Sequence, residues 1–138
     1  MTELMQFIND QLILVGTFVA LIFMLISNII GEKFKKYQDI NTNNAVSLME
    51  DKKLKIIDVR EIKERTSGYI NNDINIPLAQ IKNKLTTLNS DDKFLIYCRS
   101  GSRSAYACKQ LTKAGFTNVY NLKGGFVAWE GANMPIKK

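Results

Sequence analysis

An uncharged stretch of 19 residues, from Leu12 to Ile30, constrains the fold of this chain more than any other feature. As a helix rising about 1.5 Å per residue, it would be about 28 Å long, close to the thickness of the hydrocarbon core of a bilayer. A cleaved signal peptide carries basic residues before its apolar part. Here Glu3 and Asp10 precede the stretch, no Lys or Arg does, and no small-x-small cleavage site follows it. We therefore predict an uncleaved transmembrane helix.

The basic residues all lie on one side of this stretch. None of the 19 Lys and Arg residues precedes it, and Lys33, Lys35 and Lys36 follow it closely. The positive-inside rule then places the short N-terminus outside and the rest of the chain in the cytoplasm. We therefore expect a single-pass protein of the cell inner membrane whose C-terminal domain is cytoplasmic. Its predicted parts are an N-terminal segment with the transmembrane helix (residues 1–31), a juxtamembrane linker (32–37) and a folded domain (38–138).

Composition excludes several kinds of site. The chain has two cysteines and no histidine, which excludes a Cys–His pair, a histidine-bound metal, a usual structural zinc site and a disulfide framework. We accordingly expect no metal and no cofactor. The part after the apolar stretch carries 19 basic and 11 acidic side chains, a net charge of +8. We interpret this charge as favouring anionic inner-membrane lipid over nucleic acid, because no basic helix, zinc pattern or aromatic-basic interleaving is present.

The residues beyond 36 alternate between strand-like and helix-like patterns. Such alternation predicts an α/β domain whose mainly parallel sheet is covered by helices on both faces, with the site at the carboxyl ends of the strands. Residues 34–39 are predicted to be a short polar linker, and Gly124-Gly125 a tight turn. The predicted strands are 54–59, 73–76, 94–97 and 119–122, and the predicted helical segments are 43–51, 63–67, 78–88, 105–114 and a short helix after residue 125.

Cys98 opens a loop of small and cationic residues between the strand at 94–97 and the helix at 105–114. Inward-facing N–H groups of such a loop, together with the positive end of the helix dipole, bias a thiol towards thiolate. We therefore interpret Cys98 as a nucleophile that holds a transferable negative group; the alternative is a small apolar packing residue. Cys108 lies mid-helix and is interpreted as a buried structural thiol, with a resolving partner for Cys98 as the alternative.

Three segments, in order, resemble the signatures of rhodanese-like domains, and together they span about residues 38 to 135. Tyr69 stands where a histidine is common, and Asn72-Asp73 where Gly-Ala is common; these departures concern local turn geometry rather than the cysteine loop. The matching residues are Asp58-Val59-Arg60-Glu61 with Glu64, Gly68, Ile70 and Asn75-Ile76-Pro77; Cys98-Arg99-Ser100-Gly101-Ser102-Arg103-Ser104; and Asn121-Leu122-Lys123-Gly124-Gly125 with Ala128-Trp129.

The resemblance implies a rhodanese-like fold, a five-stranded parallel sheet flanked by helices. It also implies sulfurtransferase activity, in which Cys98 takes a sulfane sulfur from a small donor such as thiosulfate, or from a persulfide, and passes it to a thiol or cyanide. Arg103 would close the cradle around the persulfide and orient the loop, while Arg99 would attract an anionic donor. The residues expected to bind substrate are Arg99, Ser100, Gly101, Ser102 and Ser104.

The first signature supplies the expected structural support. Asp58 and Arg60 are expected to hydrogen-bond the strand end and the neighbouring loops. Glu64 is expected to pair with Arg60.

Two functions other than sulfur transfer are considered: oxyanion chemistry and protein interaction. The related dual-specificity phosphatases and arsenate reductases have five residues between cysteine and arginine, which form a wider cradle for a tetrahedral oxyanion. Here four residues separate Cys98 from Arg103, and none of them is an acid that could protonate a leaving alcohol. Phosphatase chemistry is therefore disfavoured. The second alternative is a membrane-tethered interaction module that uses a rhodanese-like domain to bind a membrane-protein partner.

Overall fold

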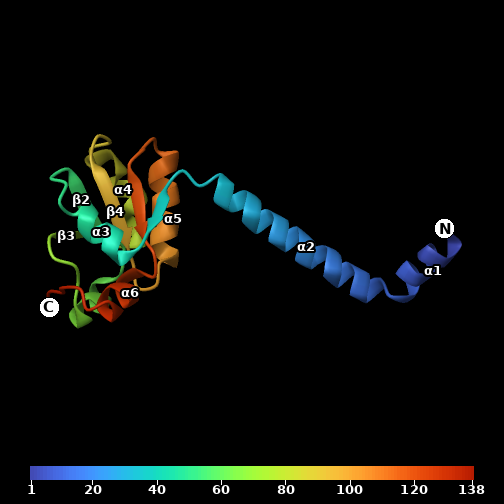
Figure 1. Ribbon diagram of the computed structural model, residues 1–138. Helices are drawn as coiled ribbons and strands as arrows, with labels where there is room; N and C mark the ends of the chain where they lie inside the picture. Colours follow the sequence, from blue (N-terminus) through green and yellow to red (C-terminus); the bar gives the residue numbers. More distant parts are fainter. The chain divides into compact units, whose positions relative to one another are not determined.

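Five strands form one parallel sheet, in the order β1-β5-β4-β2-β3, in the computed structural model, which describes all 138 residues (Figure 1). Every neighbouring pair in this sheet is parallel, which confirms the predicted five-stranded parallel sheet. The strands are β1 (Gln38–Ile40), β2 (Leu54–Asp58), β3 (Asp73–Asn75), β4 (Lys93–Tyr97) and β5 (Val119–Leu122).

β1 is the strand that the sequence pattern did not indicate. The predicted linker at 34–39 is wrong at its C-terminal end, because Gln38 pairs opposite Tyr120 and Ile40 opposite Leu122. Three residues are too few to display the period of two that marks a strand. Their pairing depends on β5, which lies near the other end of the chain.

Helical segments cover both faces of the sheet, as predicted (Figure 1). The segment predicted as one helix at 78–88 is instead a 3-10 turn, an α-helical turn and a second 3-10 turn. Asn83, Thr86 and Thr87 favour a continuous helix only weakly, which accounts for the break. The helical segments of the domain, with η denoting a 3-10 helix, are α3 (Thr42–Leu48), η1 (Ile62–Ser67), η2 (Leu78–Gln80), α4 (Ile81–Lys84), η3 (Leu85–Thr87), α5 (Ser102–Lys113) and α6 (Gly125–Gly131).

Alternate residues of the central strands pack into two separate hydrophobic cores, one on each face of the sheet. Ile57 and Ile96 face α5 and pack with its buried Leu111, whereas Ile56 and Leu95 face α3 and α6. This alternation follows from the period of two along a strand, and it requires both faces to be apolar. The sheet is therefore packed against helices on both faces.

The chain divides into two compact units, Met1–Lys35 and Lys36–Lys138. The first consists of α1 (Thr2–Asp10) and α2 (Leu12–Lys33), and none of the residues in these helices is buried. By length and apolar composition α2 fits a membrane span, a property that it shares with signal sequences. The transmembrane assignment therefore stays a prediction.

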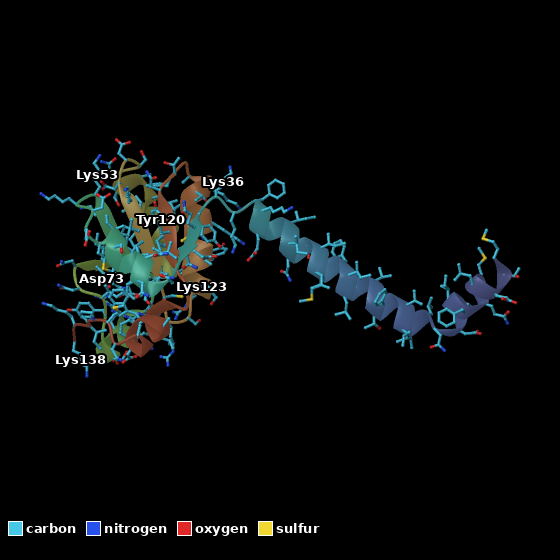
Figure 2. The ribbon with its side chains drawn as sticks, viewed as in Figure 1. Lys36, Lys53, Asp73, Tyr120, Lys123 and Lys138 are labelled. Carbon is cyan, nitrogen blue, oxygen red and sulfur yellow. The ribbon has the colours of Figure 1, made fainter.

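The folded unit begins at the end of the sheet opposite to the cysteine loop. Because β1, β5 and β4 are parallel, Gln38 starts at the amino edge, and Cys98, directly after β4, lies at the carboxyl edge. Figure 2 shows the same polarity: Lys36 and Lys53 lie at one end, and Lys123, which follows β5, lies towards the other. The candidate site is thus at the edge where parallel sheets place their ligands.

Candidate active site

The thiol of Cys98 is enclosed by the loop that follows β4, and Cys98 has no exposed surface. The Gly101 N–H donates to the Cys98 Sγ at 3.0 Å, and the Ser104 Oγ lies 3.3 Å from the same sulfur. Burial raises the pKa of Cys98, but hydrogen bonds from the Ser104 hydroxyl and from loop N–H groups outweigh it, so the pKa lies below that of an ordinary thiol. The loop therefore favours the thiolate form.

The loop leads straight into α5, which begins three residues earlier than predicted. Gly101 precedes the helix with a φ of 104°, in the left-handed region that side chains rarely adopt. Ser102, Arg103 and Ser104 consequently form the first turn of α5 rather than part of the loop. The N–H groups of a first turn have no helical partners, and they carry the positive end of the helix dipole. Cys98 lies at that end.

The amino end of α6 fixes the backbone of the cysteine loop from another side. The Phe126 N–H donates to the Cys98 carbonyl oxygen at 2.8 Å, and the Val127 N–H to the Arg99 carbonyl oxygen at 3.0 Å. Gly125 permits this approach, because a Cβ built on it would lie 2.5 Å from the Cys98 carbonyl oxygen. The sequence indicated a tight turn at this glycine but gave no sign that the turn packs on the cysteine loop.

Arg103 and Glu64 form a two-pronged ion pair. The Arg103 Nη1 donates to Glu64 Oε2 at 2.8 Å, and its Nη2 donates to Oε1 at 2.7 Å. These hydrogen bonds lower the pKa of Glu64 to about 2. The predicted pairing of the Glu64 carboxylate with Arg60 is therefore wrong. Arg60 reaches only the backbone carbonyl of Glu64, at 3.4 Å, because Asp58 occupies most of its guanidinium.

Asp58 and Arg60 are a buried ion pair, 0% and 1% exposed. The Arg60 Nη2 donates to Asp58 Oδ2 at 2.9 Å and to the Gly68 carbonyl oxygen at 2.8 Å. The same guanidinium lies 4.4 Å from the centre of the Phe126 ring. These contacts join the end of β2 to the end of η1 and to α6.

Three residues that no sequence motif singled out for a role complete this network. Arg65 Nη1 donates to Asp58 Oδ2 and to Asp73 Oδ2, both at 2.7 Å. The Tyr97 hydroxyl donates to Asp73 and accepts from the Ile70 N–H. Asp73, one of the departures from the family pattern, thus supplies the second carboxylate that balances the buried Arg60 and the partly buried Arg65. The only feature of the sequence that could have indicated this role is the position of Asp73, a charged residue at the start of a predicted strand.

The remaining candidates divide between surface and core. Arg99 and Ser100 in the loop, and Ser102 at the start of α5, are exposed. Cys108 is buried, burial raises its pKa, and neither cysteine forms a disulfide. No group of three or more Cys, Asp and Glu side chains is placed to hold a metal ion.

The profile described as "Rhodanese-like domain" matches residues 41–132 of this sequence. The chain belongs to the rhodanese-like domain family. The matched region of this rhodanese-like domain contains the first signature, the cysteine loop and the turn that packs on the loop.

Curated relatives match this chain over different shares of its length. YtwF of Bacillus subtilis is 42% identical over 85 residues, which cover 62% of this chain and 82% of YtwF. Thiosulfate sulfurtransferase GlpE of Shewanella oneidensis is 29% identical over 97 residues, covering 70% of this chain and 96% of GlpE. YibN of Escherichia coli is 29% identical over 139 residues, covering 99% of this chain and 97% of YibN, so this match includes the apolar segment.

A solved structure shows the rhodanese-like domain as a nearly complete chain. The rhodanese-related protein from Thermoplasma volcanium has a TM-score of 0.68 at 32% identity, and the match covers 73% of this chain and 98% of that chain. Almost the whole of that solved chain is thus matched by this protein. Lys36–Lys138 is likewise a compact unit with its own core on each face of the sheet.

Proposed function

We propose that this chain is a membrane-anchored sulfurtransferase that carries sulfane sulfur as a persulfide on Cys98. The proposal depends on one observation above all: the Cys98 Sγ lies among donors, with the Gly101 N–H at 3.0 Å and the Ser104 hydroxyl at 3.3 Å, at the start of α5. Membership of the rhodanese-like family, and the activity named for GlpE, support sulfur transfer from a small donor such as thiosulfate.

The proposed reaction has two displacement steps. The Cys98 thiolate attacks the sulfane sulfur of thiosulfate; a new S–S bond forms on Cys98, the S–S bond of thiosulfate breaks, and sulfite leaves with the electron pair. The persulfide carries its negative charge on the terminal sulfur, where loop N–H groups can stabilise it. A thiolate or cyanide then attacks the terminal sulfur, and Cys98 departs as thiolate. Because Cys98 is fully buried, the loop opens locally to admit each reactant.

The two arginines of the loop have different proposed roles. Arg99 is exposed and attracts the anionic donor. Arg103 acts as a positioning residue, because its guanidinium is held by Glu64 and its backbone belongs to the first turn of α5. Glu64 above all, and Cys98 to a smaller extent, raise the pKa of Arg103. The positive charge of Arg103 therefore also interacts favourably with a negative charge on the Cys98 sulfur.

The anchor in this proposal is α2, with residues 1–31 as the membrane part, 32–37 as the linker and 38–138 as the cytoplasmic domain. The length and composition of α2 support it, as do the lysines that follow. Lipid of the inner membrane is then a partner of the N-terminal unit.

The test is mass spectrometry of the fragment 36–138 after incubation with thiosulfate. One added sulfur is expected on Cys98, and transfer of that sulfur to cyanide should follow. Cys98→Ser should abolish both, whereas Cys108→Ser, the matched control in the same domain, should retain both. A wild-type fragment that gains no sulfur, or a Cys98→Ser fragment with full activity, would refute the mechanism; the first result would favour an interaction module.

A further inference from the structure

Asn121 is a polar side chain in the buried centre of the sheet, 4% exposed. It lies on β5, opposite Asp39 of β1 on one side and Ile96 of β4 on the other. Residues paired across a parallel sheet share a face, so Asn121 lies with Ile96 on the face that α5 covers. A buried polar side chain costs free energy unless it is hydrogen-bonded, so the partners of Asn121 indicate its role.

The side-chain amide of Asn121 joins the edge strand β1 to the cysteine loop. Its Nδ2 donates to Asp39 Oδ1 at 2.9 Å and to the Gly101 carbonyl oxygen at 3.4 Å. Its oxygen is buried without a hydrogen-bond partner. Because an ionised carboxylate can only accept, Asp39 fixes the amide with its N–H groups, and not its oxygen, towards Gly101. The fold therefore leaves one buried oxygen unpaired and places a donor at Gly101.

The Ser104 hydroxyl is a second side-chain donor to the Gly101 carbonyl oxygen, at 3.1 Å. The same hydroxyl oxygen lies 3.3 Å from the Cys98 Sγ. A hydroxyl carries one hydrogen, so Ser104 can donate to the carbonyl oxygen or to the sulfur. When Cys98 is a thiol, its S–H can donate to the Ser104 oxygen while Ser104 donates to Gly101. A thiolate has no hydrogen, so Ser104 then has to turn its own hydrogen to the sulfur.

We infer that Asn121 is a positioning residue of the persulfide site: it satisfies the Gly101 carbonyl oxygen and so releases the Ser104 hydroxyl to the negatively charged sulfur. The inference rests on the proposed function. A carbonyl oxygen has two lone pairs, and the Ala105 N–H, at 3.1 Å, takes one of them. Asn121 takes the other when Ser104 turns away. In the proposed reaction the Cys98 Sγ is negatively charged before the first displacement and after the second, and Ser104 donates to it at both points.

The test is a double-variant cycle in the fragment 36–138, which has its own core on each face of the sheet. Cys108→Ser leaves Cys98 as the only thiol. Asn121→Leu keeps a similar shape and removes both N–H groups, so it should raise the pKa of Cys98, measured by the ultraviolet absorbance of the thiolate against pH. With Ser104→Ala there is no hydroxyl to release, and Asn121→Leu should then cause no further shift.

Two outcomes of this cycle would overturn the inference. An equal upward shift with and without the Ser104 hydroxyl would show that Asn121 acts through packing alone, and no shift with the hydroxyl present would show that it does not act on the sulfur. Asn118→Leu, which changes the amide just before β5, is the matched control and should leave the titration unchanged. In steady-state transfer from thiosulfate to cyanide, Asn121→Leu should lower kcat about fivefold, because the leaving thiolate loses a hydrogen bond.

A second measurement leaves Asn121 unchanged and so does not depend on how its variants fold. In the Cys108→Ser fragment, the side-chain amide NMR signals of Asn121 should move with the same pH midpoint as the Cys98 absorbance, because Gly101 exchanges one donor for the other. Carboxylates and guanidinium groups do not titrate in the range of a thiol. Signals that stay constant through this titration would overturn the inference. Neither titration uses a sulfur donor, so both decide it even in a fragment that forms no persulfide, the result that refutes the proposed function.

Discussion

The two Nη atoms of Arg103 donate to the two carboxylate oxygens of Glu64, at 2.8 and 2.7 Å, although the residues are 39 positions apart in the chain. Glu64 belongs to η1, which Arg60 ties to the end of β2. Arg103 belongs to the first turn of α5, which begins at the cysteine loop. The pair thus connects a buried charge network to the helix end that holds the Cys98 thiol. Charge-assisted pairs of this two-pronged kind fix orientation as well as distance.

Glu64→Gln should slow sulfur transfer while leaving the fold intact. The amide offers one accepting oxygen, and its NH2 group cannot accept from Arg103, so the two-pronged pair is lost and the first turn of α5 is positioned less firmly. A loss of about 1 kcal/mol corresponds to about a fivefold lower kcat. The measurement is steady-state transfer from thiosulfate to cyanide. Glu130→Gln, an exposed glutamate on α6, is the control. Equal kcat values for the two variants would show that the pair has no positioning role.

The same pair should make stability depend on pH in a defined range. The folded-state pKa of Glu64, about 2, lies below its ordinary value of 4.5. Its contribution is therefore complete above pH 4.5, and it is lost as the pH falls from 4.5 towards 2. Urea unfolding should show that Glu64→Gln destabilises the fragment 36–138 more at neutral pH than near the lower end of that range. A difference that does not change with pH would contradict the assignment.

Ser104→Ala should raise the pKa of Cys98. The Ser104 hydroxyl is among the donors that lower this pKa, and its removal leaves burial opposed only by N–H groups. The loss of one hydrogen bond to the charged form moves the pKa of Cys98 upward. The ultraviolet absorbance of the thiolate, followed against pH in a Cys108→Ser background, measures it. Ser100→Ala removes only an exposed hydroxyl and should leave the titration unchanged.

Asp73→Ala should destabilise the domain through its buried charges. Asp73 balances Arg65 and accepts from Tyr97, so its loss leaves two arginines facing Asp58 alone. Removing one partner of a partly buried, hydrogen-bonded pair costs about 2 kcal/mol. Urea unfolding of the fragment measures the change. The double variant Asp73→Ala/Arg65→Met should be more stable than Asp73→Ala, because the unpaired charge is gone. Similar stabilities for Asp73→Ala and for Asp91→Ala, an exposed control, would refute this account.

The membrane anchor is tested on the full chain. Because α2 is long and apolar enough to span a bilayer, the protein should stay in the membrane fraction after high-salt and carbonate washes. In a Cys98→Ser/Cys108→Ser background, an impermeant thiol reagent added to spheroplasts should label Thr2→Cys but not Lys138→Cys. Release by carbonate would refute the span, and the reverse labelling would refute the orientation.

The sequence by itself determined the features that depend on neighbouring residues. The apolar stretch that forms α2, the strand that ends at Cys98 and the small residues that follow it are contiguous, and four of the five strands lie where their local pattern predicted. Such patterns reflect the periodicity of each element and the turn preferences of small residues, which act over a few residues. Cys98 could therefore be proposed as the nucleophile from the sequence alone.

Only the tertiary structure decided which distant residues meet at the site. β1 becomes a strand because β5 lies beside it, and Gly125 supports the cysteine loop because α6 begins against the Cys98 carbonyl oxygen. Glu64 takes Arg103 rather than Arg60 because Asp58 already holds the Arg60 guanidinium. Each of these contacts joins residues far apart in the chain, where side-chain direction and competition between partners choose the pairing. No local periodicity records that choice.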